Sequence, residues 1–188
     1  MATYRIAMIV GSLRKGSINR KIARSICAIR GDNLECSIID IGGLPLYNQD
    51  YDANSPVEYV TFRDQIRACD GVLFCTPEYN RGVPGVLKNA IDVGSRPYGE
   101  SVWHKKPAAI ISASPGMIGG FGANHQLRQA CVFLDMPVMQ QPEAYLGGAG
   151  GFFDEAGEVK VEGTRKFLET IIDSFARWVD RILADTAR

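Results

Sequence analysis

Residues 11–19 read Gly11-Ser12-Leu13-Arg14-Lys15-Gly16-Ser17-Ile18-Asn19, and this stretch indicates the fold. An apolar run of strand length, residues 4–10, comes directly before it. The isoleucines that follow have helical spacing: Ile18, Ile22, Ile26 and Ile29. A strand, a polar loop with glycine and a helix form an anion site when they follow one another, because unpaired N–H groups of the first helical turn point into the loop. We therefore interpret residues 11–19 as a phosphate-binding loop.

The polar side chains of this loop suit a phosphate ligand. Ser12, Ser17 and Asn19 can donate hydrogen bonds, and Arg14 can add a charge-assisted one. The alternative is that Ser17 only caps the helix after an ordinary turn, since serine is a common N-cap. The loop taken alone leaves both interpretations open.

Two better-known nucleotide loops are excluded by the order of residues. A Walker loop needs Gly-Lys followed by Ser or Thr, whereas this chain has Lys15-Gly16-Ser17. A dinucleotide fingerprint needs three glycines at G-x-G-x-x-G spacing, and this loop has Gly11 and Gly16 alone. A mononucleotide or a flavin phosphate is therefore a better ligand than NAD in a Rossmann site.

Apolar runs of strand length alternate with helical patterns along the rest of the chain. Strands are predicted at residues 34–41, 72–76 and 107–112, and a short fifth strand opens at Pro137. Such alternation predicts a doubly wound parallel sheet with right-handed crossovers. With the phosphate loop after the first strand, we expect a flavodoxin-like three-layer α/β sandwich, its parallel strands in the order 2-1-3-4-5.

Two helices and one connection complete the pattern. Ser55, Pro56 and Glu58 have the spacing of a capping box and predict a helix start. The last helix is strongly periodic over residues 167–183, which predicts that it packs on the sheet. The glycine-rich segment 146–163 before it is predicted only as a connection.

Two further loops follow predicted strands and should meet the first loop at the carboxyl edge of the sheet, where such folds bind ligands. Pro77-Glu78-Tyr79-Asn80 offers polar groups and one aromatic ring that can contact the edge of a flat heteroaromatic ligand. Ser112, Ser114 and Gly116 are small and allow close approach of the backbone to a ligand. Plain turns remain the alternative for both loops.

Length and charge bound the function. At 188 residues the chain fits one domain, residues 1–188, with a core large enough to fold unaided. The formal net charge is zero and there is no basic run, so neither nucleic acid nor an anionic membrane is expected as a partner. No apolar stretch approaches a membrane span and no secretory signal pattern is present, so we expect a cytoplasmic protein.

The cysteines and histidines give no sign of a metal site. The 5 cysteines are scattered and never form C-x-x-C, so we expect reduced thiols that serve in packing. The chain has 2 histidines, and neither lies at ligand spacing from a cysteine or a pair of carboxylates. We therefore expect no bound metal.

Taken together, the three loops resemble those of the NADPH-dependent FMN reductase family, in particular its quinone and chromate reductase branch. The resemblance rests on residues 11–19, on Thr76-Pro77-Glu78-Tyr79-Asn80 and on Leu87-Lys88-Asn89-Ala90-Ile91-Asp92. It continues through Leu127-Arg128-Gln129 to the last helix and so covers nearly the whole chain. Residues 121–125 are less typical of the family, which bears on how dimers would pack into a tetramer.

The resemblance implies tightly bound FMN. Carried over by position, Ser12, Arg14, Ser17 and Asn19 would hold the FMN phosphate, with Ile18 contributing its backbone. Pro77, Glu78, Tyr79 and Asn80 would line the isoalloxazine ring, and Ser114 would help to close the site. The complete expected set of cofactor-binding residues is Gly11, Ser12, Arg14, Ser17, Ile18, Asn19, Pro77, Glu78, Tyr79, Asn80, Ser112, Ser114 and Gly116.

The resemblance also implies the reaction. NADPH or NADH would pass a hydride to N5 of the flavin and leave, and an electron acceptor would then take its place in a ping-pong cycle. No catalytic side chain is expected, because the chemistry belongs to the flavin. Quinones are the expected acceptors, with chromate, azo compounds and free flavins as further ones. Homodimers or homotetramers are implied, with the flavin sites near the interface.

Two other classes of function stay open on the sequence. One is an electron-transfer protein similar to flavodoxin that docks to protein partners, and the other is a flavin-binding sensor without turnover. Flavodoxins usually have a Thr/Ser-rich phosphate loop and strong negative charge, whereas this loop carries Arg14 and the chain has zero net charge. Oxidation of NAD(P)H distinguishes the reductase from both.

Overall fold

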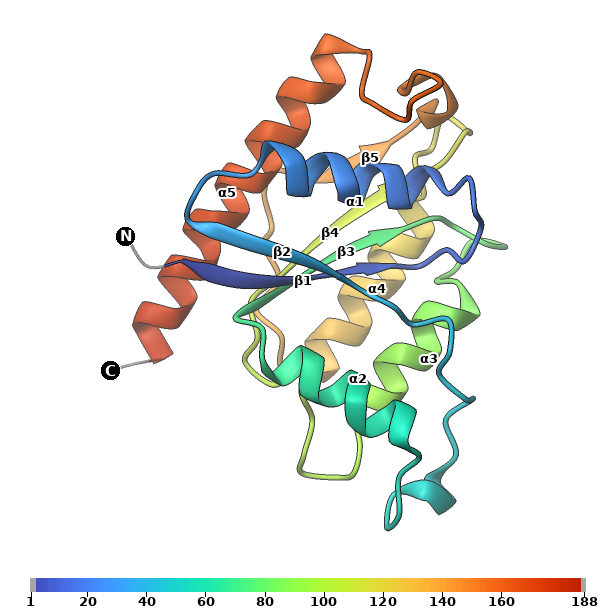
Figure 1. Cartoon of the computed structure of the whole chain (residues 1–188), viewed down its shortest axis with the longest axis vertical. Helices are drawn as coiled ribbons and strands as arrows, with labels where there is room; N and C mark the ends of the chain where they lie inside the picture. Colours follow the sequence, from blue (N-terminus) through green and yellow to red (C-terminus); the bar gives the residue numbers. More distant parts are fainter. Residues whose placement is uncertain (1–2, 187–188) are drawn as a thin grey trace.

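The computed structural model describes residues 3–186 and shows a parallel sheet flanked by helices on both faces (Figure 1). The strands run β2-β1-β3-β4-β5 across the sheet, and all four neighbouring pairs are parallel, which confirms the predicted flavodoxin-like order. The elements are β1 (Tyr4–Val10), α1 (Ile18–Ile29), β2 (Leu34–Ile39), α2 (Val57–Arg67), β3 (Gly71–Thr76), α3 (Gly85–Gly94), β4 (Ala108–Ala113), α4 (Phe121–Phe133), β5 (Ala144–Leu146) and α5 (Glu162–Thr186).

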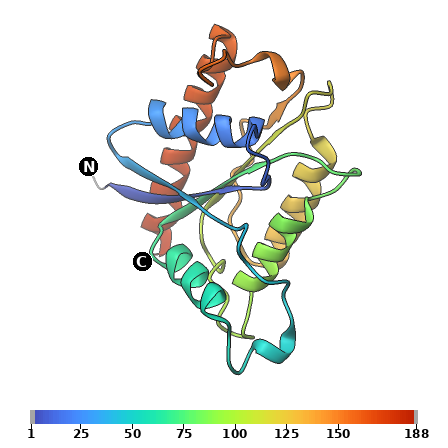
Figure 2. The ribbon, with the colours of Figure 1, turned by 45° about the vertical axis from the view of Figure 1, so that its right-hand side comes forward.

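Alternation along β1 divides the core into two layers. Ile6, Met8 and Val10 belong to the cluster of buried side chains beneath α1 and α5. Ala7 and Ile9 belong to the other cluster, which α2, α3 and α4 cover. Successive side chains of a strand point to opposite faces, so one apolar run supplies both layers. Figure 2 shows α1 and α5 on one side of the strands and α3 and α4 on the other.

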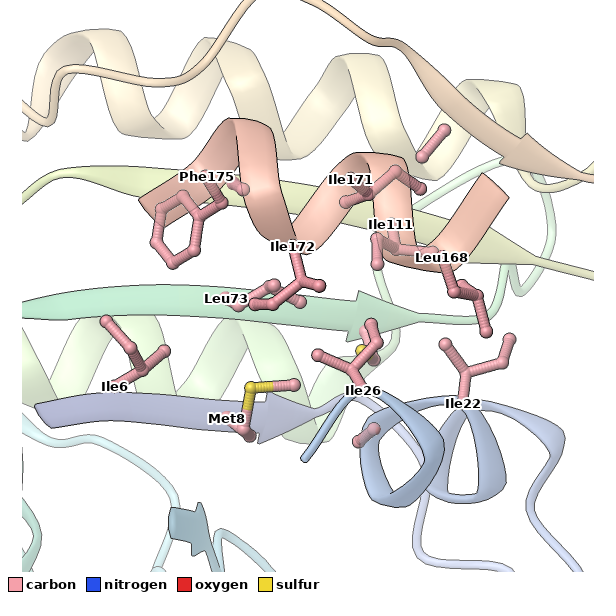
Figure 3. Close-up of a cluster of buried hydrophobic side chains, with 14 of the residues drawn as sticks. Ile6, Met8, Ile22, Ile26, Leu73, Ile111, Leu168, Ile171, Ile172 and Phe175 are labelled. Carbon is pink, nitrogen blue, oxygen red and sulfur yellow. The ribbon is translucent and has the colours of Figure 1, made fainter. Parts of the chain in front are cut away.

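The layer under α1 and α5 fixes the start of the phosphate loop. Figure 3 shows Ile22 and Ile26 of α1 facing the sheet beside Leu168 of α5. All three side chains are fully buried. The isoleucine spacing therefore gives α1 its predicted buried face, and packing of that face holds the helix N-terminus at the end of β1.

The start of α2 differs from the prediction. No side-chain cap is present at its N-terminus, and Pro56 occupies the N-cap position, so the capping box of Ser55 and Glu58 is wrong. The Ser55 hydroxyl instead donates to the Tyr51 carbonyl and accepts from Arg63, at 3.1 and 2.9 Å. Competition from these partners removes Ser55 from its capping role.

The fifth strand also differs from the prediction. Val138 forms an isolated parallel bridge with Ala108, and regular pairing with β4 begins only at Ala144. Pro142 lies between the two pairing sites and has no N–H to donate to a sheet. The segment after β5 contains a 3₁₀ turn at Ala149–Gly151 and an antiparallel bridge between Phe153 and Val159, so it carries more structure than a bare connection.

Within residues 3–186, no helix is long and apolar enough to span a membrane. All of the cysteines are described and none forms a disulfide. Cys69, Cys75 and Cys131 are buried, as a packing role predicts, whereas Cys27 and Cys36 are half-buried. No group of three metal-ligating side chains occurs among the described residues.

Candidate functional site

The three predicted loops meet at the carboxyl edge of the sheet (Figures 1 and 2). The Gly11 N–H donates to the Cys75 carbonyl at 2.9 Å and ties the first loop to the end of β3. The Asn19 amide donates to the Ala113 carbonyl at 3.3 Å and ties the start of α1 to the end of β4. Strand order thus brings together residues that lie far apart in the sequence.

Ser17 is the N-cap of α1. Its hydroxyl oxygen accepts from the Arg20 N–H at 3.2 Å, and its own N–H donates to the Arg14 carbonyl at 3.1 Å. The capping interpretation is therefore correct, and it is compatible with the phosphate interpretation. A hydroxyl that accepts one bond still carries a proton for donation to a ligand.

Burial separates the loop into a polar interior and a charged rim. Ser12, Ser17 and Asn19 are buried, at 4%, 3% and 2% exposure. Arg14 and Lys15 are exposed and supply positive charge beside the helix N-terminus. Negative ligand groups would be met by buried donors below and by cations above.

Asn19 has a buried polar atom without a hydrogen-bond partner, which indicates a ligand site. Its Oδ1 is buried and has no hydrogen-bond partner among the described residues, while its Nδ2 is bonded to Ala113. A buried acceptor without a partner is costly, and a ligand hydroxyl would satisfy it. An ionised phosphate has no proton to donate, so this oxygen suits a hydroxyl of a sugar or polyol better than the phosphate itself.

The two glycines of the loop have different roles. A Cβ on Gly11 would lie 3.0 Å from Thr76 Oγ1 and 3.1 Å from Leu87 Cδ2, so a side chain just after β1 would press on β3 and α3. A Cβ on Gly16 would meet nothing within 4 Å. Packing within the chain therefore does not explain Gly16.

The second loop is a tight turn. Tyr79 and Gly82 exchange backbone hydrogen bonds of 3.1 and 3.0 Å, and Asn80 and Arg81 between them have φ of 51° and 66°. Two successive residues at positive φ are typical of a type I′ turn. The turn leaves Tyr79 at 49% exposure, with Asn80 exposed beside it.

Glu78 does not point freely into the loop. Its Oε2 accepts from the Ala123 N–H in the first turn of α4 at 3.1 Å, and its Oε1 accepts from Arg81 at 3.1 Å. Gly122 permits this contact, because a Cβ there would lie 2.9 Å from Glu78 Oε2. The sequence did not indicate this arrangement, although a glycine inside a helix is a signal of close packing.

The third loop, like the first, has a buried part and an exposed part. Ser112 is fully buried; its hydroxyl donates to the Ala144 carbonyl and accepts from the Asn124 amide, both at 3.3 Å. The Ser114 hydroxyl accepts from the Gly116 N–H at 3.1 Å, and Gly116 is exposed. Ser112 thus lies beneath the loop, while Ser114 and Gly116 form its surface.

The remaining predicted residues complete the placement. Pro77 is half-buried at the end of β3, and Ile18 is half-buried at the start of α1, where it packs against the core.

A surface cavity of about 600 Å³ lies at the opposite edge of the sheet, between the C-terminal end of α4 and α5. Its lining includes Val132, Met136 and Ile182 and none of the predicted site residues.

A parallel sheet of this order, with a phosphate-type loop after its first strand, defines the class of flavodoxin-like proteins. The sequence model of the NADPH-dependent FMN reductase family matches residues 4–151. The chain therefore belongs to the NADPH-dependent FMN reductase family, and its cofactors are FMN and NAD(P)H.

Curated relatives and a solved structure agree with this placement. A quinone reductase from Pseudomonas putida is 59% identical over 177 residues, which are 94% of this chain and 95% of the relative. A 2-hydroxy-1,4-benzoquinone reductase from a Burkholderia species is 47% identical, over 93% and 96% of the two chains. The flavoenzyme NAD(P)H:(acceptor) oxidoreductase FerB from Paracoccus denitrificans is 40% identical and superposes with a TM-score of 0.89, over 95% and 98%.

Proposed function

We propose that this chain is an NAD(P)H:quinone oxidoreductase, in which residues 1–188 form a single FMN-binding domain. The observation that carries the proposal is the junction of the three loops, where the buried donors Ser12 and Ser17 and the unsatisfied Asn19 Oδ1 lie around the N-terminus of α1. The names of the relatives support quinones as the acceptors.

The residues of the first loop fit FMN. Its phosphate would take hydrogen bonds from Ser12, Ser17 and the free N–H groups at the start of α1, with the Arg14 guanidinium above it. The Asn19 Oδ1 would accept from a ribityl hydroxyl, the class of donor that this buried oxygen lacks. Ile18 would contribute its backbone, and Gly11 would hold the loop against β3.

The other two loops would hold the isoalloxazine ring. Tyr79 and Asn80 are exposed on a tight turn, and Pro77 and Glu78 fix where that turn begins. Ser114 and Gly116 would approach the ring from the third loop, with Ser112 supporting them from beneath. Bound FMN supplies hydride and electron transfer at N5, so the side chains orient the reactants and need not act as acids or bases.

Further properties belong to the proposal. Either NADH or NADPH would serve as donor, and chromate, azo compounds and free flavins would be accepted besides quinones. We also propose a homodimer or homotetramer. We propose a cytoplasmic location as well, and the unpaired cysteines support this location. We expect no nucleic acid as a partner.

Steady-state kinetics with NADPH and benzoquinone tests the proposal. We expect NADPH oxidation that depends on FMN-loaded protein and on quinone, with parallel double-reciprocal lines for the two substrates, as a ping-pong cycle requires. Flavin that is reduced only by a protein partner would favour the electron carrier. Bound flavin that neither NADPH nor NADH reduces, with or without partners, would favour the sensor.

A further inference from the structure

The first two turns of α4 contact both ends of the second loop. Glu78 at the start of the loop accepts from the Ala123 N–H at 3.1 Å, and Val83 at its end donates its N–H to Gln126 Oε1 at 2.6 Å. Ala123 and Gln126 lie less than one turn apart on the helix. The turn from Tyr79 to Gly82 lies between these two attachments.

Two glycines allow the loop and the helix to approach this closely. A Cβ on Gly122 would lie 2.9 Å from the Arg81 carbonyl oxygen, so a side chain there would press on the backbone of the turn. A Cβ on Gly82 would lie 2.8 Å from Gln126 Oε1 and would displace this flexible amide from Val83. The Gln126 side chain thus occupies space that a side chain at position 82 would take.

Gln126 binds the last N–H group of the loop before α3. Val83 is half-buried and packs against the core, Pro84 after it has no N–H, and α3 begins at Gly85. Gln126 is exposed, so its hydrogen bond to Val83 adds little to the stability of the fold. The bond instead fixes the position of the loop where the chain enters α3.

The same turns of α4 also hold the third loop. Asn124 is fully buried, and its amide donates to the Ser112 hydroxyl at 3.3 Å. The helix starts directly after the third loop, with Gly120 in the N-cap position. One end of one helix therefore sets the spacing between the second and third loops, the two that are proposed to hold the isoalloxazine ring.

We infer that Gln126 is a positioning residue for the proposed flavin site. Its amide oxygen holds the far end of the second loop through Val83, as Glu78 holds the near end, and the two bonds together fix the turn that carries Tyr79 and Asn80. The inference rests on the proposed function, in which this turn lines the flavin ring. The role needs no contact between Gln126 and the flavin, and no proton or electron passes through its amide.

Amide hydrogen exchange of the apoprotein, followed by NMR, measures the attachment directly. Gln126→Met removes the acceptor and keeps the length of the side chain, so the Val83 N–H should exchange about two- to tenfold faster, the effect of one hydrogen bond. Gln126→Glu keeps an acceptor oxygen and should restore slow exchange. Gln129→Met makes the same change at another exposed glutamine of α4 and is the matched control. Equal Val83 exchange in the wild type and in Gln126→Met would overturn the attachment.

Titration of the same variants with FMN measures the positioning role. Gln126→Met should raise the FMN dissociation constant about two- to tenfold, since the cofactor must then order the loop end that the lost bond had fixed. Its thermal unfolding midpoint should match the wild type, and Gln126→Glu and Gln129→Met should bind FMN like the wild type. Faster Val83 exchange with an unchanged FMN dissociation constant in Gln126→Met would overturn the positioning role and leave the proposed function standing. A wild-type protein that binds no FMN is a different result, which would contradict the proposed function and this inference with it.

Discussion

The Glu78 carboxylate accepts a hydrogen bond from the Ala123 N–H, 3.1 Å away in the first turn of α4. This bond joins the second loop to a helix that begins more than 40 residues later, and a negative charge at a helix N-terminus is favourable. Glu78 therefore anchors the turn that carries Tyr79 and Asn80 to the N-terminus of α4.

Glu78→Ala should lower both stability and FMN affinity. A hydrogen bond to a charged group contributes about 1.5–3 kcal/mol, and its loss frees the turn from α4. Urea unfolding of the apoprotein and FMN titration measure the two effects. Arg81→Ala is the control, since an ion pair with an exposed cation contributes only about 0–1 kcal/mol. Wild-type values for Glu78→Ala in both assays would show that the turn keeps its conformation without the hydrogen bond to α4.

Arg14→Ala should weaken FMN binding by about 1.5–3 kcal/mol and leave the stability of the apoprotein unchanged. Arg14 is exposed, so the fold does not depend on it, whereas a phosphate would lose a charge-assisted partner. Fluorescence titration of FMN gives the dissociation constant. Lys15→Ala removes the same charge from the neighbouring position and is the control. If both variants weaken FMN binding equally, the positive charge of the loop attracts the phosphate and Arg14 makes no specific contact with it.

The two glycines of the first loop should respond differently to alanine. Gly11→Ala should destabilise the protein by about 1–3 kcal/mol, because the new Cβ presses on Thr76 and Leu87. Gly16→Ala should leave thermal stability within about 0.5 kcal/mol of the wild type, because the new methyl meets no atom of the chain, and should reduce FMN affinity by crowding a phosphate bound in the loop. Unchanged FMN affinity in Gly16→Ala would show that the phosphate does not approach Gly16.

Substitutions at Asn80 should separate its side chain from its backbone. Asn80→Gly keeps the positive φ without strain, so we expect an intact fold with slower quinone turnover or weaker FMN binding. Asn80→Ala should lose about 1–2 kcal/mol of stability in addition, the cost of a left-handed conformation with a Cβ. If Asn80→Gly turns over like the wild type, the Asn80 side chain is structural and does not contact the ring.

Local periodicity was enough to predict most of the fold. The apolar run of β1 and the isoleucines of α1 need no distant partner to be recognised, and the strand order followed from the position of the phosphate loop. Convergence of the three loops could be predicted as well, because it follows from parallel strands ending at one edge. The Gly11 and Asn19 hydrogen bonds to β3 and β4 agree with that expectation.

Features that depend on distant partners could not be predicted. Ser55 looked like a helix cap because its competing partner Arg63 lies beyond the capping motif. Asn89 is part of a family motif on α3, yet its buried amide bonds the Pro45 carbonyl and the Tyr47 N–H. The role of Glu78 depends on Gly122, far along the chain. In each case the partner lies outside the local stretch of sequence from which the element was predicted.

The visible absorption spectrum of the purified protein, recorded without oxygen before and after NADPH and then after a quinone, tests the central claim most directly. We expect an FMN spectrum that bleaches with NADPH and returns with the quinone. A protein that binds no FMN, even after incubation with the cofactor, would contradict the assignment of all three loops. Bound FMN that stays oxidised with both NADPH and NADH would contradict the reductase function while leaving the site in place.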